Sequence, residues 1–207
     1  MSNVINLPKF IVVDGIDGVG KSLLVNNIQS YLTDKEYDSR IVHVVESTPL
    51  AASVKATLKS ADAGALSATT LGLLFSAAIS DVIEKVIQPA HEKGQIIISD
   101  RYTMSTRVYQ SDSDYIEKIC DIVDSLLIPD ITFVLDAPPE VIQARVGNRG
   151  SDGDVTESIC DKEINKRRMA YAKLANLYDK DTYIIDASGS PEDVLSRVKE
   201  ILDTYYR

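Results

Sequence analysis

Eight consecutive residues have the types and the spacing of a phosphate-binding loop: Gly15-Ile16-Asp17-Gly18-Val19-Gly20-Lys21-Ser22. They match the pattern G-x-x-x-x-G-K-[ST] without a substitution. In such a loop the glycines allow backbone N–H groups to surround an anion, the lysine reaches the β- and γ-phosphates, and the hydroxyl ligates Mg²⁺. The sequence therefore predicts a site for a nucleoside triphosphate, formed by Gly15, Asp17, Gly18, Val19, Gly20, Lys21, Ser22 and Leu23.

The residues on either side of this loop fit the structure that such a loop needs. Phe10–Val13 is a short apolar run with β-branched residues, as in a buried strand, and apolar residues recur at helical spacing over Leu23–Leu32. The start of that helix, near Lys21, adds the positive end of its dipole to the anion site. The alternative interpretation, an ordinary glycine-rich turn, would not require this strand and helix.

Four more apolar runs read as strands, and helical patterns separate them. The runs are continuous in Ile and Val, which is typical of a parallel sheet covered on both faces. The sequence predicts an α/β, P-loop NTPase-type three-layer fold: a five-stranded parallel sheet flanked by helices, in a single domain over residues 1–207. The later strands are expected at Ile41–Val45, Ile96–Ser99, Ile131–Leu135 and Tyr183–Ile185, and the later helices at 66–87, 115–127, 158–178 and 191–205.

Composition limits the kind of protein and its partners. The 207 residues are 44% apolar and 26% charged, as in an ordinary soluble globular domain, and no stretch is long and apolar enough for a membrane span. The net charge of −9 argues against a general nucleic-acid surface but not against small-molecule nucleotides. Cys120 and Cys160 have no metal-binding spacing and are interpreted as reduced thiols of a cytoplasmic protein.

The third apolar run ends in Asp100-Arg101, and this pair is a second candidate for phosphate chemistry. In open α/β sheets ligands bind beyond the carboxyl ends of the strands, so the pair is expected near the phosphate-binding loop. An acid there can hold Mg²⁺ through water, which makes Ser22 and Asp100 the candidate metal residues, and an arginine can form two bonds to a phosphate. Taken alone, such a pair is more often a cap or a surface ion pair, but two phosphate features at the expected strand ends favour a functional role.

Longer segments resemble those of one family. Asp100–Gln110 resembles the D-R-Y-x-x-S-x-x-A-Y-Q signature of thymidylate kinases, which phosphorylate dTMP, and Leu73–Ala77 resembles their L-L-F-A-A helix. Ile128–Glu140 resembles their P-D-L-T-x-x-L-D-x-P-P-E strand, Arg168–Tyr171 their R-x-x-Y, and Ile185–Ala187 their final I-D-A. The resemblance runs in order from about Phe10 to Leu202.

This resemblance implies roles for single residues on the acceptor side. Asp14 would help to place the acceptor phosphate or the magnesium, and Arg101 would grip that phosphate. Phe75 would stack on the acceptor base, Thr106 would bond the base edge, and Tyr109 would pack under the sugar and exclude a 2′-hydroxyl. The acceptor residues implied are Asp14, Phe75, Ile79, Arg101, Ser105, Thr106, Arg107 and Tyr109.

A lid and a dimer are also implied. Gly147–Asp154 is rich in glycine and turn formers, and we expect a lid at about 145–157, in which Arg149 reaches the transferring phosphoryl group and Arg145 assists at the ATP site. The alternative is a mobile surface loop. Phosphoryl transfer needs alignment and charge neutralisation, so Lys21, Arg101, Arg149 and Asp14 are the candidate catalytic residues. Members of the family are typically homodimers, and we expect a homodimer through the 66–87 helix.

The chain departs from the family pattern at the acceptor base. Where the family continues with Asp-Arg after its L-L-F-A-A, this chain has Ala78 and Ile79, so a hydrocarbon replaces a donor to thymine. A buried carbonyl that loses its donor costs about 1–3 kcal/mol. Arg107 stands where alanine is common, and our hypothesis is that it reaches the base instead; a solvated helix surface is the other interpretation. The R-E-P-G-G-T-P-L segment is shortened to Val45–Leu50.

Three functions follow from the sequence. The first is a kinase that transfers the γ-phosphoryl of Mg·ATP to dTMP to give dTDP. The second is a kinase for a modified pyrimidine, such as 5-hydroxymethyl-dUMP, or for several bases. The third is a nucleotide-binding regulatory protein without transfer activity, against which the intact Lys21, Ser22, Asp100 and Arg101 weigh. The cluster Lys166–Arg168 is interpreted as a helix surface beside the lid, with Arg168 toward the nucleotide.

Overall fold

A computed structural model of the chain describes residues 8–60, 65–147, 160–178 and 181–206. This part of the chain forms one five-stranded sheet in the order β2-β3-β1-β4-β5, and all its pairings are parallel. The predicted parallel sheet is therefore confirmed. The strands are β1 (Phe10–Gly15), β2 (Ser39–His43), β3 (Ile96–Asp100), β4 (Ile131–Asp136) and β5 (Thr182–Asp186).

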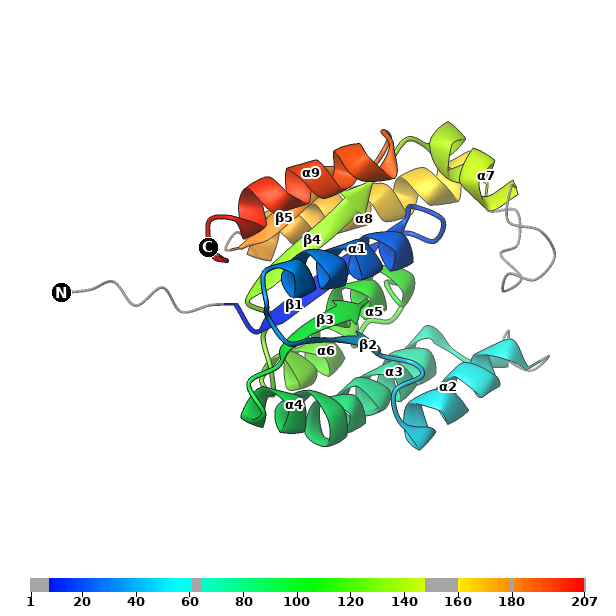
Figure 1. The fold of residues 1–207 in the computed structure, drawn as a ribbon. Coiled ribbons are helices and arrows are strands. Elements are labelled where there is room, and N and C mark those ends of the chain that lie inside the picture. The colour runs from blue at the N-terminus through cyan, green and yellow to red at the C-terminus, as the bar shows by residue number, and fades with distance from the viewer. Residues whose placement is uncertain (1–7, 61–64, 148–159, 179–180, 207) are drawn as a thin grey trace.

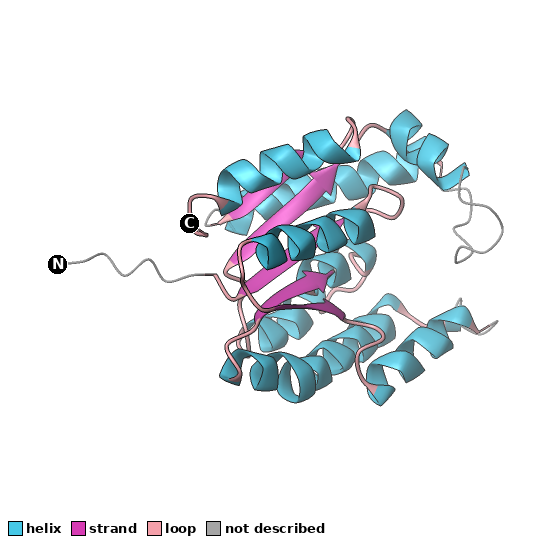
Figure 2. Cartoon of the chain, in the orientation of Figure 1, coloured by secondary structure: helices cyan, strands magenta, loops and turns pink. Residues whose placement is uncertain are grey.

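Helices cover both faces of the sheet and make a three-layer molecule (Figures 1 and 2). One layer holds α1 (Lys21–Asp34) and α9 (Pro191–Leu202). The opposite layer holds α5 (Thr103–Tyr109), α6 (Ile116–Asp124) and α8 (Asp161–Tyr178). A long rod made of α3 (Ala68–Val82), the π-helical turn η2 (Ile83–Ile87) and α4 (Gln88–Glu92) packs beside α6, α2 (Pro49–Lys59) packs on α3, and α7 (Pro139–Gly147) packs on α8.

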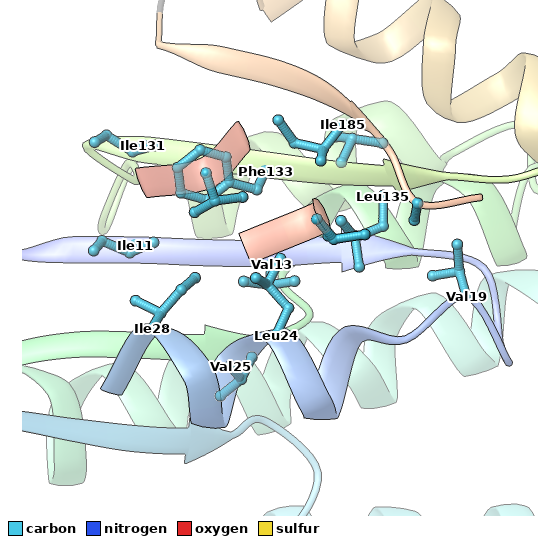
Figure 3. Close-up of a cluster of buried hydrophobic side chains, with 14 of the residues drawn as sticks. Ile11, Val13, Val19, Leu24, Val25, Ile28, Ile131, Phe133, Leu135 and Ile185 are labelled. Atoms are coloured by element: carbon cyan, nitrogen blue, oxygen red, sulfur yellow. The ribbon is translucent and has the colours of Figure 1, made fainter. Parts of the chain in front are cut away.

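The core lies on both sides of β1, because successive side chains of a strand point to opposite faces of a sheet. Ile11 and Val13 belong to a cluster that includes α1, whereas Phe10 and Val12 belong to a second cluster with α3 and η2. Figure 3 shows the first cluster, in which side chains of β1, β4 and α1 meet and Val19 of the phosphate-binding loop joins them. The loop is therefore anchored on the core.

The strand register gathers polar residues at one edge of the sheet. Val13 pairs with Asp100, Asp14 with Val134, and Asp136 with Asp186. All strands run the same way, so the carboxyl ends of β1, β3, β4 and β5 reach this edge together. The phosphate-binding loop starts from the same edge, directly after β1, which places the candidate site there.

Two element boundaries differ from the predictions for identifiable reasons. Strand β2 begins at Ser39 and ends at His43, because the N–H groups of Glu46 and Ser47 bond the His43 carbonyl and close a turn. The helix expected over 66–87 continues past Pro89 to Glu92. Its hydrogen bonds change register in η2, where the Gln88 N–H bonds the Ile83 carbonyl, so the proline is accommodated.

Within the described residues, α2 and α7 were not predicted as helices, whereas α4 continues the predicted 66–87 helix and α5 is the helix on which Arg107 was expected, without bounds. The start of α2 could have been predicted from Thr48-Pro49. The Thr48 hydroxyl caps the helix by accepting from the Ala51 N–H, and Pro49 occupies the first turn. Of the lid expected at about 145–157, residues 145–147 form the end of α7, and the remainder lies outside the described residues. In the described residues we find no helix with the length and apolar character of a membrane span.

Candidate active site

The phosphate-binding loop needs glycine at two positions. Gly15 has φ of 133°, and a Cβ there would lie 2.6 Å from the Leu135 carbonyl oxygen. Gly18 has φ of 83°, and its Cβ would lie 2.5 Å from a methyl of Val146. Both positions combine left-handed backbone with close neighbours, so a side chain would distort the loop.

The start of α1 is arranged as an anion site. Gly20 is the N-cap in left-handed conformation, and within the described residues no side chain caps this helix end. The first turn contains no acidic residue. The N–H groups of this turn and the positive dipole end therefore remain for an anion, as expected for a phosphate-binding loop. Leu23, in the same turn, is exposed.

Lys21 is buried beneath the loop. Its Nζ donates to the Ile16 carbonyl at 2.9 Å and lies 3.9 Å from the Asp17 carboxylate. Burial and, after it, the charge of Arg101 lower the pKa of Lys21 to about 8, although the nearby carboxylates oppose this shift. An anion entering the loop would stabilise the protonated amine.

Arg101, Asp17 and Tyr109 form one connected network beside the loop. The Arg101 guanidinium pairs with the Asp17 carboxylate and donates to the Gly15 carbonyl at 3.2 Å and to Ser105 Oγ at 2.8 Å. The Tyr109 hydroxyl donates to Asp17 Oδ2 at 2.7 Å, and the Asp17 N–H donates to that hydroxyl at 3.2 Å. The predicted residues of the loop and of α5 are thus brought together.

Burial and the charges in this network shift the pKa values of Asp17 and Tyr109. Burial would raise the pKa of Asp17, but the positive charges of Arg101 and Lys21 outweigh it and hold that pKa at about 2. Burial raises the pKa of Tyr109 to about 12, although Arg101 opposes the rise. Asp17 is therefore an anion and Tyr109 a neutral donor near neutral pH.

The backbone of Arg101 is strained. Its φ of 75° lies in the left-handed region, which costs a residue with a side chain roughly 1–2 kcal/mol. Its N–H bonds the Val13 carbonyl at 3.0 Å, which continues the β1–β3 pairing past the end of β3. This conformation turns the guanidinium toward the loop, and backbone strain of this kind is characteristic of functional sites.

Asp14 is enclosed by hydrogen-bond donors of the protein. Its side chain is 0% exposed, and it accepts hydrogen bonds from the Gly15 N–H, from the N–H and hydroxyl of Ser105, and from the Tyr171 hydroxyl, at 2.5–3.1 Å. Both carboxylate oxygens are therefore used within the protein. Asp14 ties β1 to α5 and α8, and its part in placing the acceptor phosphate or the magnesium stays a prediction.

Ser22 and Asp100 are adjacent at the mouth of the loop, as predicted. The Ser22 hydroxyl donates to Asp100 Oδ2 at 2.9 Å, and His43 Nδ1 lies 3.8 Å from the same oxygen. A hydroxyl and a carboxylate oxygen form a donor set suited to Mg²⁺. Within the described residues, no group of three or more His, Cys, Asp or Glu side chains is placed to hold a metal ion by itself.

Arg107 corrects an expectation, because it lies neither on a solvated surface nor in the network around Arg101. Its guanidinium nitrogens lie 2.9 Å from carboxylates of Glu117, Asp121 and Asp124 on α6. Its guanidinium also lies over the ring of Tyr178, 5.7 Å from the centroid. The hypothesis that Arg107 reaches the acceptor base is therefore wrong, and Arg107 joins α5 to α6 instead.

The remaining acceptor residues lie near the rod. Phe75 on α3 is partly buried against the second core cluster, whereas Ile79, one turn later, is fully buried within it. The Ile79 hydrocarbon thus serves packing. Ser105 and Thr106 on α5 are both buried, and Ser105 belongs to the Asp14 and Arg101 contacts.

Arg145 connects two loops beside the phosphate site. Its Nη1 donates to the Val19 carbonyl and its Nη2 to the Gly189 carbonyl, both at 3.0 Å. It therefore lies next to the predicted ATP site, where it fixes the loop after β5 to the phosphate-binding loop. Arg149, the predicted lid arginine, lies outside the described residues.

Helix α8 contributes site residues that the sequence did not identify. The Tyr171 hydroxyl bonds Asp14 at 2.9 Å, and the Arg167 guanidinium lies over the ring of Tyr109 at 4.4 Å from its centroid. The R-x-x-Y motif and the spacing of four residues between 167 and 171 could have indicated this face. Arg168, expected to face the nucleotide, instead forms two bonds with Asp136 at 2.7 and 2.9 Å.

The parallel sheet with an anion-binding loop at its carboxyl edge defines a P-loop nucleotide-binding protein. A family model described as thymidylate kinase matches residues 13–198 of the chain. Over 204 residues the chain is 32% identical to a thymidylate kinase of Pseudoalteromonas translucida, covering 96% of this chain and 97% of that protein. It is 30% identical to a thymidylate kinase of Desulfovibrio desulfuricans, with 96% of each chain covered. It is 31% identical to one of Alkalilimnicola ehrlichii, covering 94% of this chain and 92% of that protein.

The chain therefore belongs to the thymidylate kinase family, and its members are phosphotransferases.

Proposed function

We propose that this protein transfers the γ-phosphoryl group of ATP to the 5′-phosphate of dTMP and forms dTDP. The observation that supports the proposal is that two groups able to bind an anion lie together at the carboxyl ends of the strands. The phosphate-binding loop with Lys21 is the first, and Arg101 with Ser105 is the second. Two such groups suit a reaction between two phosphorylated substrates, and the relatives named above carry the name of this activity.

On the donor side, the loop and Lys21 would hold the triphosphate. Lys21 now donates to a carbonyl of the loop itself, so its amine can exchange that bond for a phosphate oxygen without moving far. Ser22 and Asp100 would hold a magnesium ion together with the nucleotide. When bound, such an ion neutralises charge on the β- and γ-phosphates.

On the acceptor side, Arg101 would bind the phosphate of dTMP. Its bonds to Asp17 and Ser105 hold the guanidinium in place before substrate arrives. A guanidinium forms two parallel bonds with a phosphate, which fixes both its position and its orientation. Alignment of the two phosphates is the main contribution that a protein makes to this reaction.

The acceptor base is proposed to lie against Phe75, and Tyr109 to pack under the sugar. Phe75 is partly buried and leaves part of its ring for stacking. Ile79 offers no hydrogen bond to a base, and this observation supports a second candidate, a kinase for a modified pyrimidine such as 5-hydroxymethyl-dUMP or for several bases.

We further propose a homodimer formed through α3. Leu73 on α3 and Ile122 on α6 are exposed although large and apolar, and α3 packs against α6, so the two can contribute to one surface. Sedimentation of the protein and of a Leu73→Glu variant tests this, with a shift to monomer expected in the variant. A cytoplasmic location is in keeping with the free thiols of Cys120 and Cys160.

The decisive experiment is an ADP-release assay with Mg·ATP and each natural deoxynucleoside monophosphate, together with 5-hydroxymethyl-dUMP. We expect the highest kcat/KM with dTMP, and no turnover in a Lys21→Ala control. Preference for another base would support the second candidate. If ATP binds but no acceptor is phosphorylated, the kinase proposal fails.

A further inference from the structure

The Tyr109 hydroxyl bonds the phosphate-binding loop, whereas its ring contacts arginines that lie outside that loop. Its hydroxyl both donates to and accepts from Asp17. Its ring lies beside two guanidinium groups, that of Arg101 at 5.2 Å from the centroid and that of Arg167 at 4.4 Å. Arg167 thus makes the closer contact, although it comes from α8 and has no part in the phosphate-binding loop.

Arg167 is itself fixed on α8. Its Nε donates to the Glu163 carboxylate, one turn earlier, at 2.9 Å. Tyr171, one turn later, bonds the buried Asp14. Because residues four apart share a helix face, α8 presents Arg167 and Tyr171 to the site together. The neighbours of Arg167 point elsewhere: Lys166 lies 3.7 Å from Asp112, and Arg168 bonds Asp136.

Tyr109 needs such support because it is the last residue of α5, a helix of seven residues. The ends of short helices are the least fixed parts of a helix. A guanidinium over an aromatic face is attracted to the electrons of the ring and also restricts its rotation. A tyrosine ring that is free to move would release Asp17 and, with it, one partner of Arg101.

We propose that Arg167 is a positioning residue of the acceptor site: its guanidinium holds the Tyr109 ring, and through that ring it sets the geometry in which the acceptor nucleotide binds. This inference rests on the proposed function for the identity of the acceptor. It assigns Arg167 no contact with either nucleotide.

A double-mutant cycle tests the inference in the full-length protein. Arg167→Ala, Tyr109→Leu and the double variant are compared by the KM for dTMP at saturating Mg·ATP and by the KM for ATP at saturating dTMP. Lys166→Ala is the matched control, since it removes the preceding cation of the same helix. Tyr109→Phe, which keeps the ring and loses the hydroxyl, is a second background.

We expect Arg167→Ala to raise the KM for dTMP about fivefold to thirtyfold, or about 1–2 kcal/mol at 1.4 kcal/mol per factor of ten. The KM for ATP should change less than about twofold, as should both constants in Lys166→Ala. In the Tyr109→Leu background the Arg167 change should have no further effect. In the Tyr109→Phe background its effect should persist. If Tyr109→Leu turns over too slowly, equilibrium binding of dTMP gives the same comparison.

Other outcomes overturn the inference. An effect of Arg167→Ala that persists in the Tyr109→Leu background would mean that Arg167 acts directly on the nucleotide. An equal rise in both KM values would indicate a general structural role, and no change at all would remove the inference. Wild-type turnover separates these results from a failure of the proposed function. If another monophosphate is preferred, the cycle is run with that acceptor, and if none is bound, both proposals fall.

Discussion

Arg101 and Arg107 stand near opposite ends of α5, and each places its guanidinium among carboxylates and a tyrosine ring. Arg101 pairs with Asp17 and lies 5.2 Å from the ring centroid of Tyr109. Arg107 lies among three carboxylates of α6 and 5.7 Å from the ring centroid of Tyr178. The side chain of Arg101 is 24% exposed and that of Arg107 only 3%.

The difference lies in the partners. The close carboxylate partner of Arg101, Asp17, belongs to the phosphate-binding loop, so an incoming phosphate can replace it. The carboxylate partners of Arg107 belong to α6, which packs against α5 on another side, where Thr103 also bonds Asp124 at 2.7 Å. The same residue chemistry therefore serves helix packing at Arg107 and, in our proposal, substrate binding at Arg101, and the element that supplies the carboxylates distinguishes the two.

The largest expected effect comes from Arg101. We expect Arg101→Met to lower kcat/KM for dTMP by roughly 10³-fold or more, since the variant loses both the phosphate partner and its charge. Arg101→Lys should recover only part of this, because an ammonium cannot form the two parallel bonds. Steady-state kinetics measure both variants. Activity within tenfold of wild type in Arg101→Met would show that the two arginines do not differ in function.

The next effect comes from Arg107 and concerns stability. We expect Arg107→Ala to lower the free energy of unfolding by about 3–5 kcal/mol, because carboxylates around a buried cation are left without it. Activity per folded molecule should stay within about tenfold of wild type. Denaturant unfolding measures the first quantity, and kinetics at low temperature measure the second. Unchanged stability combined with a large rise in the KM for dTMP would restore the original sequence hypothesis.

A third test uses pH. Burial holds the pKa of Lys21 at about 8, so above that pH the free enzyme loses the charge that binds phosphate. We expect kcat/KM for ATP to fall about tenfold per pH unit above pH 8, while kcat falls only at higher pH, because bound phosphates keep the amine protonated. Arg101 contributes to lowering this pKa.

The comparison of the arginines is sharpened by measuring Mg·ATP binding against pH in variants. The pH at which binding has fallen to half should be higher in Arg101→Met than in wild type. In Arg107→Lys it should be the same as in wild type. A midpoint that is the same in wild type and Arg101→Met would contradict the coupling between Arg101 and Lys21.

The smallest effects separate the carboxylates around Arg107. Asp124 is 20% exposed and also bonds Thr103 and Tyr178, whereas Asp121 is 70% exposed. We expect Asp124→Asn to destabilise the protein by about 1–3 kcal/mol and Asp121→Asn by less than about 1 kcal/mol. Parallel unfolding curves test the order, and a reversed order would mean that the exposed pair holds Arg107.

Local sequence predicted the sheet and the loop because both depend on neighbouring residues. Runs of Ile and Val specify buried parallel strands, and the loop is one continuous motif. The direction of Arg107 could not be predicted in this way, since it depends on how α5 packs on α6. The burial of Asp14 could not be predicted for the same reason: Tyr171, which helps to enclose it, lies 157 residues away.

The π-helical turn η2 has a consequence for how this chain can change in length. The Gln88 N–H bonds the Ile83 carbonyl, five residues earlier, whereas a regular α-helical bond spans four residues. The turn therefore contains one residue more than a regular turn, as if one residue had been inserted. Each inserted residue rotates the following helix by about 100°. The extra residue lies in η2, just before Pro89. The side chains of Phe75 and Ile79, on α3, therefore point in the same directions as they would in an uninterrupted helix. We therefore expect an insertion or deletion to be tolerated better at η2 than between Phe75 and Ile79.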